Sequence, residues 1–85
     1  MKHAGPAALE TLEPLLAQLR GIEGLVEKNR GTFYRKSRAL LHFHEDPTGM
    51  YADVRLEPDG DFTRLRVTTA AEQKRLLREV RSVLS

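Results

Sequence analysis

The sequence lacks cysteine and tryptophan altogether among its 85 residues. Without cysteine, a disulfide framework, a thiolate metal site and thiol catalysis are all excluded. No apolar run approaches the roughly 18 residues that a membrane-spanning helix needs. Residues 1–6 also lack the apolar stretch of a signal peptide. We therefore expect a cytoplasmic protein without a membrane partner.

Motifs of catalysis and cofactor binding are missing too. The six glycines are scattered at expected helix ends and turns, so there is no dinucleotide fingerprint and no phosphate-binding loop. Ser37 has no flanking glycines of a nucleophile elbow, and Ser82 and Ser85 belong to the last expected helix. These absences predict a protein that is not an enzyme and that carries no catalytic residue and no cofactor.

The composition is that of an ordinary globular protein, with 40% hydrophobic residues, 31% charged residues and a net charge of +2. A chain of this length has room for one core, so we predict a single domain over residues 1–85. Only residues 68–85 are basic by count, with four basic and two acidic side chains. The simplest interpretation of that charged helix face is a solvated surface.

Two segments show the apolar period of amphipathic helices. The first covers residues 7–20 and ends at Gly21. Pro14 leaves two interpretations open, a single kinked helix or a helix capped by Thr11 with Pro14 in its first turn. The leucine pattern runs through Pro14 and favours the single helix.

The second helix is expected over residues 70–84. Thr69 and Glu72 have the spacing of a capping box at its start. Leucines and valines then repeat on one face of the helix.

Two turn signals lie between the helices, at residues 46–49 and 57–60, each with proline second and glycine fourth. They divide the middle of the chain into short alternating segments. The expected strands are residues 32–35, 38–45, 50–56 and 61–67. The predicted fold is therefore α+β, with an N-terminal helix, a three- to four-stranded antiparallel meander and a C-terminal helix, and with both helices on one face of the sheet.

A symmetrical hairpin at each turn fixes the register of the sheet. The inward pairs become Ala39 with Leu56, Leu41 with Val54, Phe43 with Ala52, Ala52 with Leu65, and Met50 with Val67. All are apolar, and a slip of one residue would turn the polar set into the core, so the pattern favours this register.

The opposite face of the sheet should meet solvent or a partner, because two short helices cover only one side. Its three rows are Leu40, Arg55 and Phe62; His42, Asp53 and Arg64; and His44, Tyr51 and Arg66, with Arg38 at one end. The candidate binding residues are Arg38, Leu40, His42, His44, Tyr51, Arg55, Phe62, Arg64 and Arg66.

Basic and aromatic side chains interleave on this face. Rings stack on bases and arginines contact phosphates in proteins that bind single-stranded nucleic acid. A solvated antiparallel face would produce the same alternation without any ligand. Phe62 and Leu40, as large apolar groups on a charged face, fit a protein partner or a second copy of the chain instead.

His42 and His44 also suggest a metal site. They point the same way, and Asp53 lies opposite His42, so two imidazoles and a carboxylate could bind Zn²⁺. Ordinary pairing of histidine with aspartate explains the same residues, and Arg64 and Arg66 beside them would repel a cation. We assign no metal ligand from the sequence.

Residues 19–25 (LRGIEGL) lead into residues 31–46 (GTFYRKSRALLHFHED), and this stretch resembles the YjbR-like (MmcQ) family of small bacterial proteins. The resemblance covers residues 9–67 and rests on a strand-turn-strand rhythm. It implies a frataxin-like arrangement of helices and antiparallel sheet, and DNA binding has been suggested for the family. This chain is shorter and reaches its last helix directly after the third clear strand, so no binding residue is carried over.

Together these patterns predict a bacterial-type binding module that uses its open sheet face, with nucleic acid slightly ahead as the ligand. The alternative is a protein-interaction or homodimerisation domain that does not bind nucleic acid.

Overall fold

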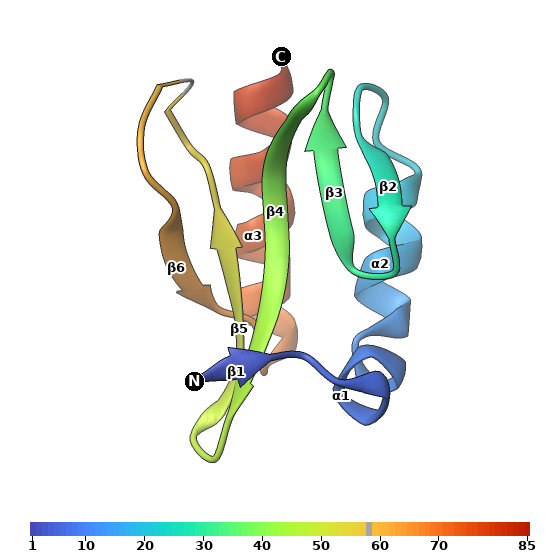
Figure 1. Ribbon diagram of the computed structural model, residues 1–85, viewed down its shortest axis with the longest axis vertical. Coiled ribbons are helices and arrows are strands. Elements are labelled where there is room, and N and C mark those ends of the chain that lie inside the picture. Colours follow the sequence, from blue (N-terminus) through green and yellow to red (C-terminus); the bar gives the residue numbers. More distant parts are fainter. Residues whose placement is uncertain (58) are drawn as a thin grey trace.

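The computed structural model describes residues 1–57 and 59–85 and consists of one antiparallel sheet with helices packed against it (Figure 1). The elements in chain order are β1 (Lys2–His3), α1 (Pro6–Thr11), α2 (Glu13–Arg20), β2 (Val26–Asn29), β3 (Thr32–Arg35), β4 (Arg38–Asp46), β5 (Gly49–Val54), β6 (Thr63–Arg66) and α3 (Ala70–Leu84). The predicted α+β class, the antiparallel sheet and the C-terminal helix are confirmed. None of the described helices has the length and apolar character needed to cross a membrane.

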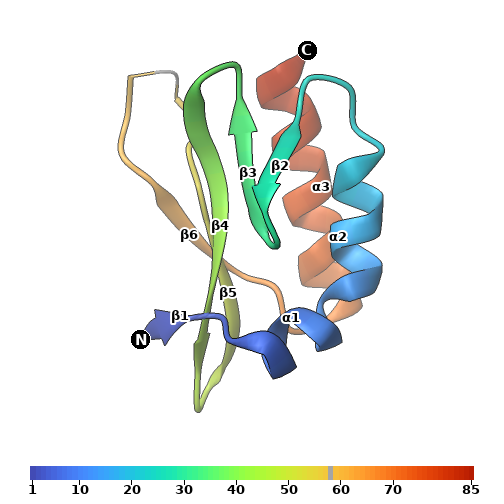
Figure 2. The same cartoon turned by 45° about the vertical axis from the view of Figure 1, so that its right-hand side comes forward.

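The sheet is larger than predicted, since its described part has six strands where three or four were expected. Five of them follow the order β2-β3-β4-β5-β6. The long strand β4 pairs with β3 near its start and with β1 near its end, where His3 lies opposite His44 (Figure 2). The N-terminal strand therefore completes the part of the β4 edge that β3 does not reach.

The predicted register is confirmed wherever the strands pair. Leu41 lies opposite Val54, and Ala52 lies opposite both Phe43 and Leu65. The remaining two predicted pairs, Ala39 with Leu56 and Met50 with Val67, lie beyond the paired residues. A backbone hydrogen bond of 2.8 Å from Val67 N to Met50 O continues the contact at one end.

Two predicted strands are too long, because β5 ends at Val54 and β6 covers only Thr63–Arg66. The backbone contact between β4 and β5 continues by one residue, since Arg55 N donates a 2.8 Å hydrogen bond to Leu40 O. Arg55 donates hydrogen bonds to Ala39 O at 3.2 Å and to Gly60 O. These side-chain contacts hold the loop that follows β5. Pro58, in the second predicted turn, lies outside the described residues.

The N-terminal helix is broken, so the prediction of one helix over residues 7–20 is wrong. Leu12 ends α1 and caps α2, and Pro14 sits in the first turn of α2. Proline has no N–H to donate to the carbonyl four residues earlier, and its ring crowds that carbonyl. The alternative position of Pro14 is thus the observed one, although the cap is Leu12 and not Thr11.

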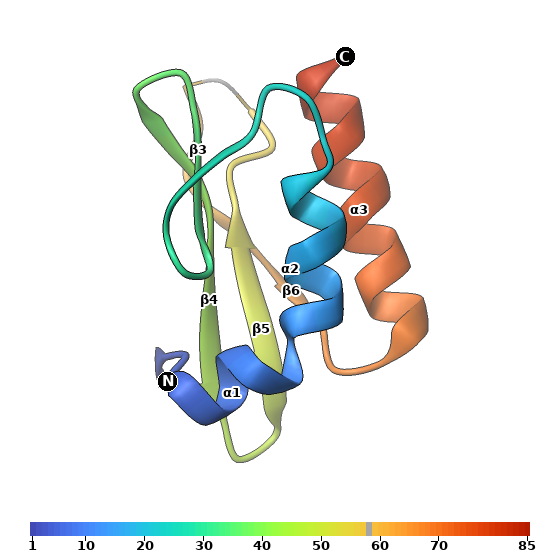
Figure 3. The same cartoon turned by 90° about the vertical axis from the view of Figure 1, so that its right-hand side faces the viewer.

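The helix α3 has the predicted bounds and the predicted capping box, in which Thr69 and Glu72 exchange hydrogen bonds. Helices α2 and α3 lie side by side on one face of the sheet (Figure 3). The hydrophobic core consists of Leu12, Leu15, Leu16, Leu19, Phe33, Leu40, Leu41, Phe43, Ala52, Val54, Leu65, Val67, Leu76, Leu77 and Val80.

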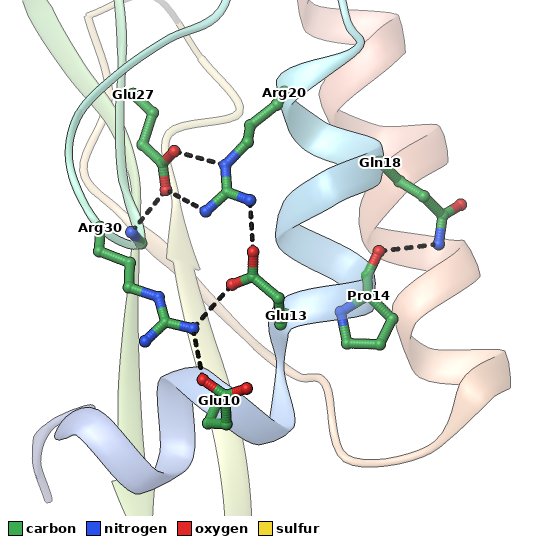
Figure 4. Close-up of polar contacts among 8 residues, drawn as sticks. Glu10, Glu13, Pro14, Gln18, Arg20, Glu27 and Arg30 are labelled. Atoms are coloured by element: carbon green, nitrogen blue, oxygen red, sulfur yellow. Dashed lines mark hydrogen bonds and ion pairs between the residues drawn. The ribbon is translucent and has the colours of Figure 1, made fainter.

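An ion-pair network fastens α1 and α2 to the β2–β3 hairpin (Figure 4). Arg20 of α2 bridges Glu13 and Glu27, and Arg30 bridges Glu10 and Glu13. The strand β2 was not predicted, because its sequence VEKN has no apolar alternation. It is held partly by this network, since Glu27 lies on β2 and its carboxylate also accepts a 2.9 Å hydrogen bond from Gly31 N.

Acid should loosen this network. The hydrogen bonds from Arg20 and then Arg30 lower the pKa of Glu13 from 4.5 to about 2. A carboxylate with a depressed pKa stabilises the fold fully above its ordinary pKa, and this contribution is lost as the pH falls towards the folded value. We expect the free energy of unfolding to fall between pH 4.5 and about 2, and to fall less steeply in Glu13→Gln.

Urea unfolding at several pH values measures this slope. Glu23→Gln is the matched control, because Glu23 is exposed and forms no ion pair within residues 1–57 and 59–85. Equal slopes for wild type and Glu13→Gln would contradict the assignment.

Candidate functional site

The face of the sheet opposite α2 and α3 carries the predicted rows in the predicted order. His42, Asp53 and Arg64 lie side by side across β4, β5 and β6, and the next row is His44, Tyr51 and Arg66. The third row, Leu40, Arg55 and Phe62, lies beyond the β4–β5 pairing. It is held by the Arg55 guanidinium, which stacks on the Phe62 ring at 4.3 Å from the ring centroid.

The face is less open than the sequence predicted. Leu40 is only 4% exposed, and His44 and Asp53 are 8% and 7% exposed. Leu40 belongs to the hydrophobic core cluster, and the Phe62 ring packs against His42 with 4.7 Å between the centroids. The expectation that Leu40 and His44 are uncovered is therefore wrong, whereas Arg38, Arg64 and Arg66 do reach solvent.

Asp53 is the buried charge of the site. Arg64 donates two hydrogen bonds to its carboxylate, Nε to Oδ1 at 2.8 Å and Nη2 to Oδ2 at 2.9 Å. These bonds lower the pKa of Asp53, against the opposing effect of burial. Nε2 of His44 lies 3.1 Å from Oδ2 of the same carboxylate, within ion-pair distance but too poorly aligned for a hydrogen bond. Asp53 is thus an ionised carboxylate that accepts hydrogen bonds from Arg64 and lies beside His44.

A third histidine joins the two that the sequence singled out. The strand β1 places His3 opposite His44 with 4.7 Å between ring centroids, and His3 lies 5.8 Å from His42. The His42 and His44 rings are 5.0 Å apart. Burial lowers the pKa of His42, which favours its neutral form. Sequence reasoning missed His3, because a two-residue strand has no period to detect.

The exposed arginines of the face are held by carboxylates. Arg66 donates from Nη1 to both oxygens of Glu72 at 3.0 Å, and Arg38 lies 3.6 Å from Asp59. With Asp53 bound to Arg64, three of the four arginines have an acidic neighbour. These carboxylates therefore offset much of the positive charge of the face.

A basic hollow of about 470 Å³ lies at the β3–β4 turn, at the end of the sheet next to Val83 of α3. Its charged lining residues are Arg35, Lys36, Arg38, Arg55 and Asp59. Lys36 and Arg38 are exposed. Sequence reasoning included Arg38 and Arg55 but missed Arg35 and Lys36, which lie in and next to a tight turn where no strand alternation assigns a face.

Comparisons with known proteins add no relative. No protein-family model matches the sequence, and neither the curated proteins nor the solved structures contain a significant match. The resemblance to the YjbR-like family stays a prediction, and the geometry of the chain is what bears on its function.

Proposed function

We propose that this protein is a small binding module that binds nucleic acid through its phosphate backbone on the open face of the sheet. The carrying observation is the basic hollow at the β3–β4 turn, where four cationic side chains face one carboxylate. The hollow shares Arg38 and Arg55 with the sheet face. Arg64 and Arg66 follow on β6, two residues apart on that face.

The chemistry of these groups favours contacts with the phosphate backbone over contacts with bases. Phe62 already carries Arg55 on its ring and His42 at its edge, and the Tyr51 hydroxyl is hydrogen bonded to Thr48 at 2.8 Å. Both rings are only partly exposed, so stacking on bases contributes little. Binding through phosphates depends strongly on salt and weakly on sequence.

The alternative, self-association through this face, has less support. It relied on Leu40, Tyr51 and Phe62 as an exposed apolar set, and Leu40 is buried in the core. The large apolar side chains that are exposed in the described part of the chain are Met1 and Val26. Met1 directly precedes β1, and Val26 is the first residue of β2. Sedimentation velocity at several concentrations tests this alternative, and a dimer that Tyr51→Ala abolishes would support it.

Removing two cations from the hollow should weaken binding. We expect Lys36→Ala combined with Arg38→Ala to lower the affinity for a labelled single-stranded oligonucleotide. Each lost phosphate contact also reduces the slope of log affinity against log salt by about 0.7. Fluorescence anisotropy between about 50 mM and about 200 mM salt measures both effects. Arg64 is left intact, because its loss would strand the buried carboxylate of Asp53.

The matched control is Arg75→Ala combined with Arg78→Ala, which removes the same charge from exposed positions on α3. This variant should keep the slope and affinity of the wild type, apart from a small effect of net charge. No binding at low salt, or an equal loss in both double variants, would remove nucleic acid as the ligand of this face.

A further inference from the structure

Three histidines converge at one end of the sheet, where β1 meets β4. His3, His42 and His44 each offer a ring nitrogen, and these three nitrogens all lie within 4.8 Å of one another. Two of the rings come from β4 and the third from the strand paired with it. The β1–β4 pairing therefore assembles the cluster from residues 39 or more positions apart in the sequence.

The cluster contains ring nitrogens that the fold leaves unused. Nδ1 of His42 and both nitrogens of His44 are buried and have no hydrogen-bond partner among the described residues. Buried polar atoms are nearly always paired in folded proteins, and an unpaired group calls for an explanation such as an absent ion. A bound cation would supply a partner for one nitrogen of each ring.

The surroundings of the cluster match those of metal-binding histidines. Such a histidine commonly has a carboxylate at its other ring nitrogen, which sets the tautomer and the ring orientation. Asp53 lies 3.1 Å from Nε2 of His44, and Arg64 fixes Asp53 with two hydrogen bonds. Nε2 is thus the nitrogen of His44 that lies beside the carboxylate, which leaves Nδ1 of the same ring as the metal ligand.

The electrostatic objection raised by the sequence does not hold. Arg64 and Arg66 were expected to repel a cation beside the histidines. Arg64 is bound to Asp53 and Arg66 to Glu72, so each positive charge has a carboxylate in contact with it. The ligand set would therefore face two ion pairs and not two free guanidinium groups.

We propose that His3, His42 and His44 form a binding site for a divalent transition metal of the zinc class. Three imidazoles suit zinc and its neighbours over magnesium or calcium, which prefer oxygen ligands. Three protein ligands leave a fourth position for water or a further ligand. Zinc–nitrogen bonds of about 2.0–2.1 Å place tetrahedral ligand nitrogens about 3.3 Å apart. The rings must close in slightly, which the exposed His3 on β1 allows.

Titration with zinc alone tests the site. We expect one zinc ion per chain by isothermal titration calorimetry, and cobalt in its place should give the visible absorption bands of a tetrahedral site. His3→Ala and His42→Gln should each weaken zinc binding by at least about tenfold. Mutation of residues that only hydrogen-bond to a metal ligand already lowers metal affinity by about 10- to 100-fold. His3 is exposed, so its variant removes a ligand without disturbing the core.

The control is Arg66→Ala, which changes the same face without touching a ligand and should keep the zinc affinity. Circular dichroism confirms that each variant is folded. Absence of saturable zinc binding, or zinc binding that survives either His3→Ala or His42→Gln unchanged, overturns the three-histidine site. Loss on His3→Ala alone would place the ion elsewhere near the start of the chain. The titration contains no nucleic acid, so its outcome is independent of the proposed function.

Discussion

Replacing Phe33 with alanine should lower the free energy of unfolding by about 3–5 kcal/mol. Phe33 on β3 is fully buried and is the largest fully buried side chain in the described core. The truncation removes the transfer free energy of the ring and leaves a cavity between close-packed elements. A domain of this length is stable by only about 4–13 kcal/mol, so the variant should stand close to unfolding at 25 °C.

The neighbouring Tyr34→Ala is the matched control. Tyr34 is an aromatic residue on the same strand, but it is only partly buried and its ring has Lys28 over it, with Nζ 4.8 Å from the ring centroid. Its truncation should cost about 1 kcal/mol. Urea unfolding of both variants measures the difference. Equal costs, or a larger cost at Tyr34, would mean that β3 presents a different residue to the core.

Replacing Gly49 with alanine should destabilise the protein by about 2–4 kcal/mol, the sum of backbone strain and overpacking. Gly49 closes the β4–β5 hairpin with a φ of +140°, which side-chain-bearing residues rarely adopt. A Cβ atom there would also come very close to Thr68 Oγ1. Thr68 cannot easily move away, because its hydroxyl accepts a 2.8 Å hydrogen bond from Met50 N.

Two further variants separate strain from crowding. Gly21→Ala at the end of α2 should be nearly neutral, since Gly21 has a φ of −82° and its Cβ would meet only an ordinary contact at 3.5 Å. Thr68→Ala should relieve the crowding, so Gly49→Ala should cost less in the Thr68→Ala background than in the wild type. Thermal unfolding of wild type, Gly49→Ala, Thr68→Ala and the double variant gives the coupling free energy between the two positions. If the changes in the free energy of unfolding are additive, the Thr68 side chain moves aside at no cost and does not crowd the new Cβ atom.

The register and α3 could be predicted because local signals determined them. The turn at residues 46–49 closes a hairpin whose apolar alternation allows one register, since a slip of one residue would bury charges. For α3 the capping box and the apolar period agree with each other. Local propensity and tertiary packing point the same way in both cases, so the sequence pattern was enough.

The missed elements depend on contacts between distant residues. The strand β2 has charged residues and is fastened to α2 through Arg20 and Glu27, a pairing that no local pattern reports. The loop after β5 is held by Arg55, whose side chain reaches Ala39 O and Gly60 O. The break at Leu12 follows from Pro14, but the leucine period on both sides concealed it.

The same distinction applies to the candidate site. The row of His42, Asp53 and Arg64 followed from the register, and so did the ion pair between Asp53 and Arg64. His3 could not be placed, because its neighbour in space is 41 residues away and its strand is two residues long. The burial of Leu40 was equally out of reach, since strand alternation assigns it to the open face although it is part of the core cluster.

The strand β1 also has a consequence for the behaviour of the chain in concentrated solution. It occupies backbone groups of β4 at His44 and Glu45, and Ala4 N donates a 3.1 Å hydrogen bond to Phe43 O. An uncovered length of strand with free N–H and C=O groups is a template on which other chains can add and aggregate. The strand β1 and the amide of Ala4 thus cover the end of β4. Lys2 adds a charge that discourages another strand from pairing beside it.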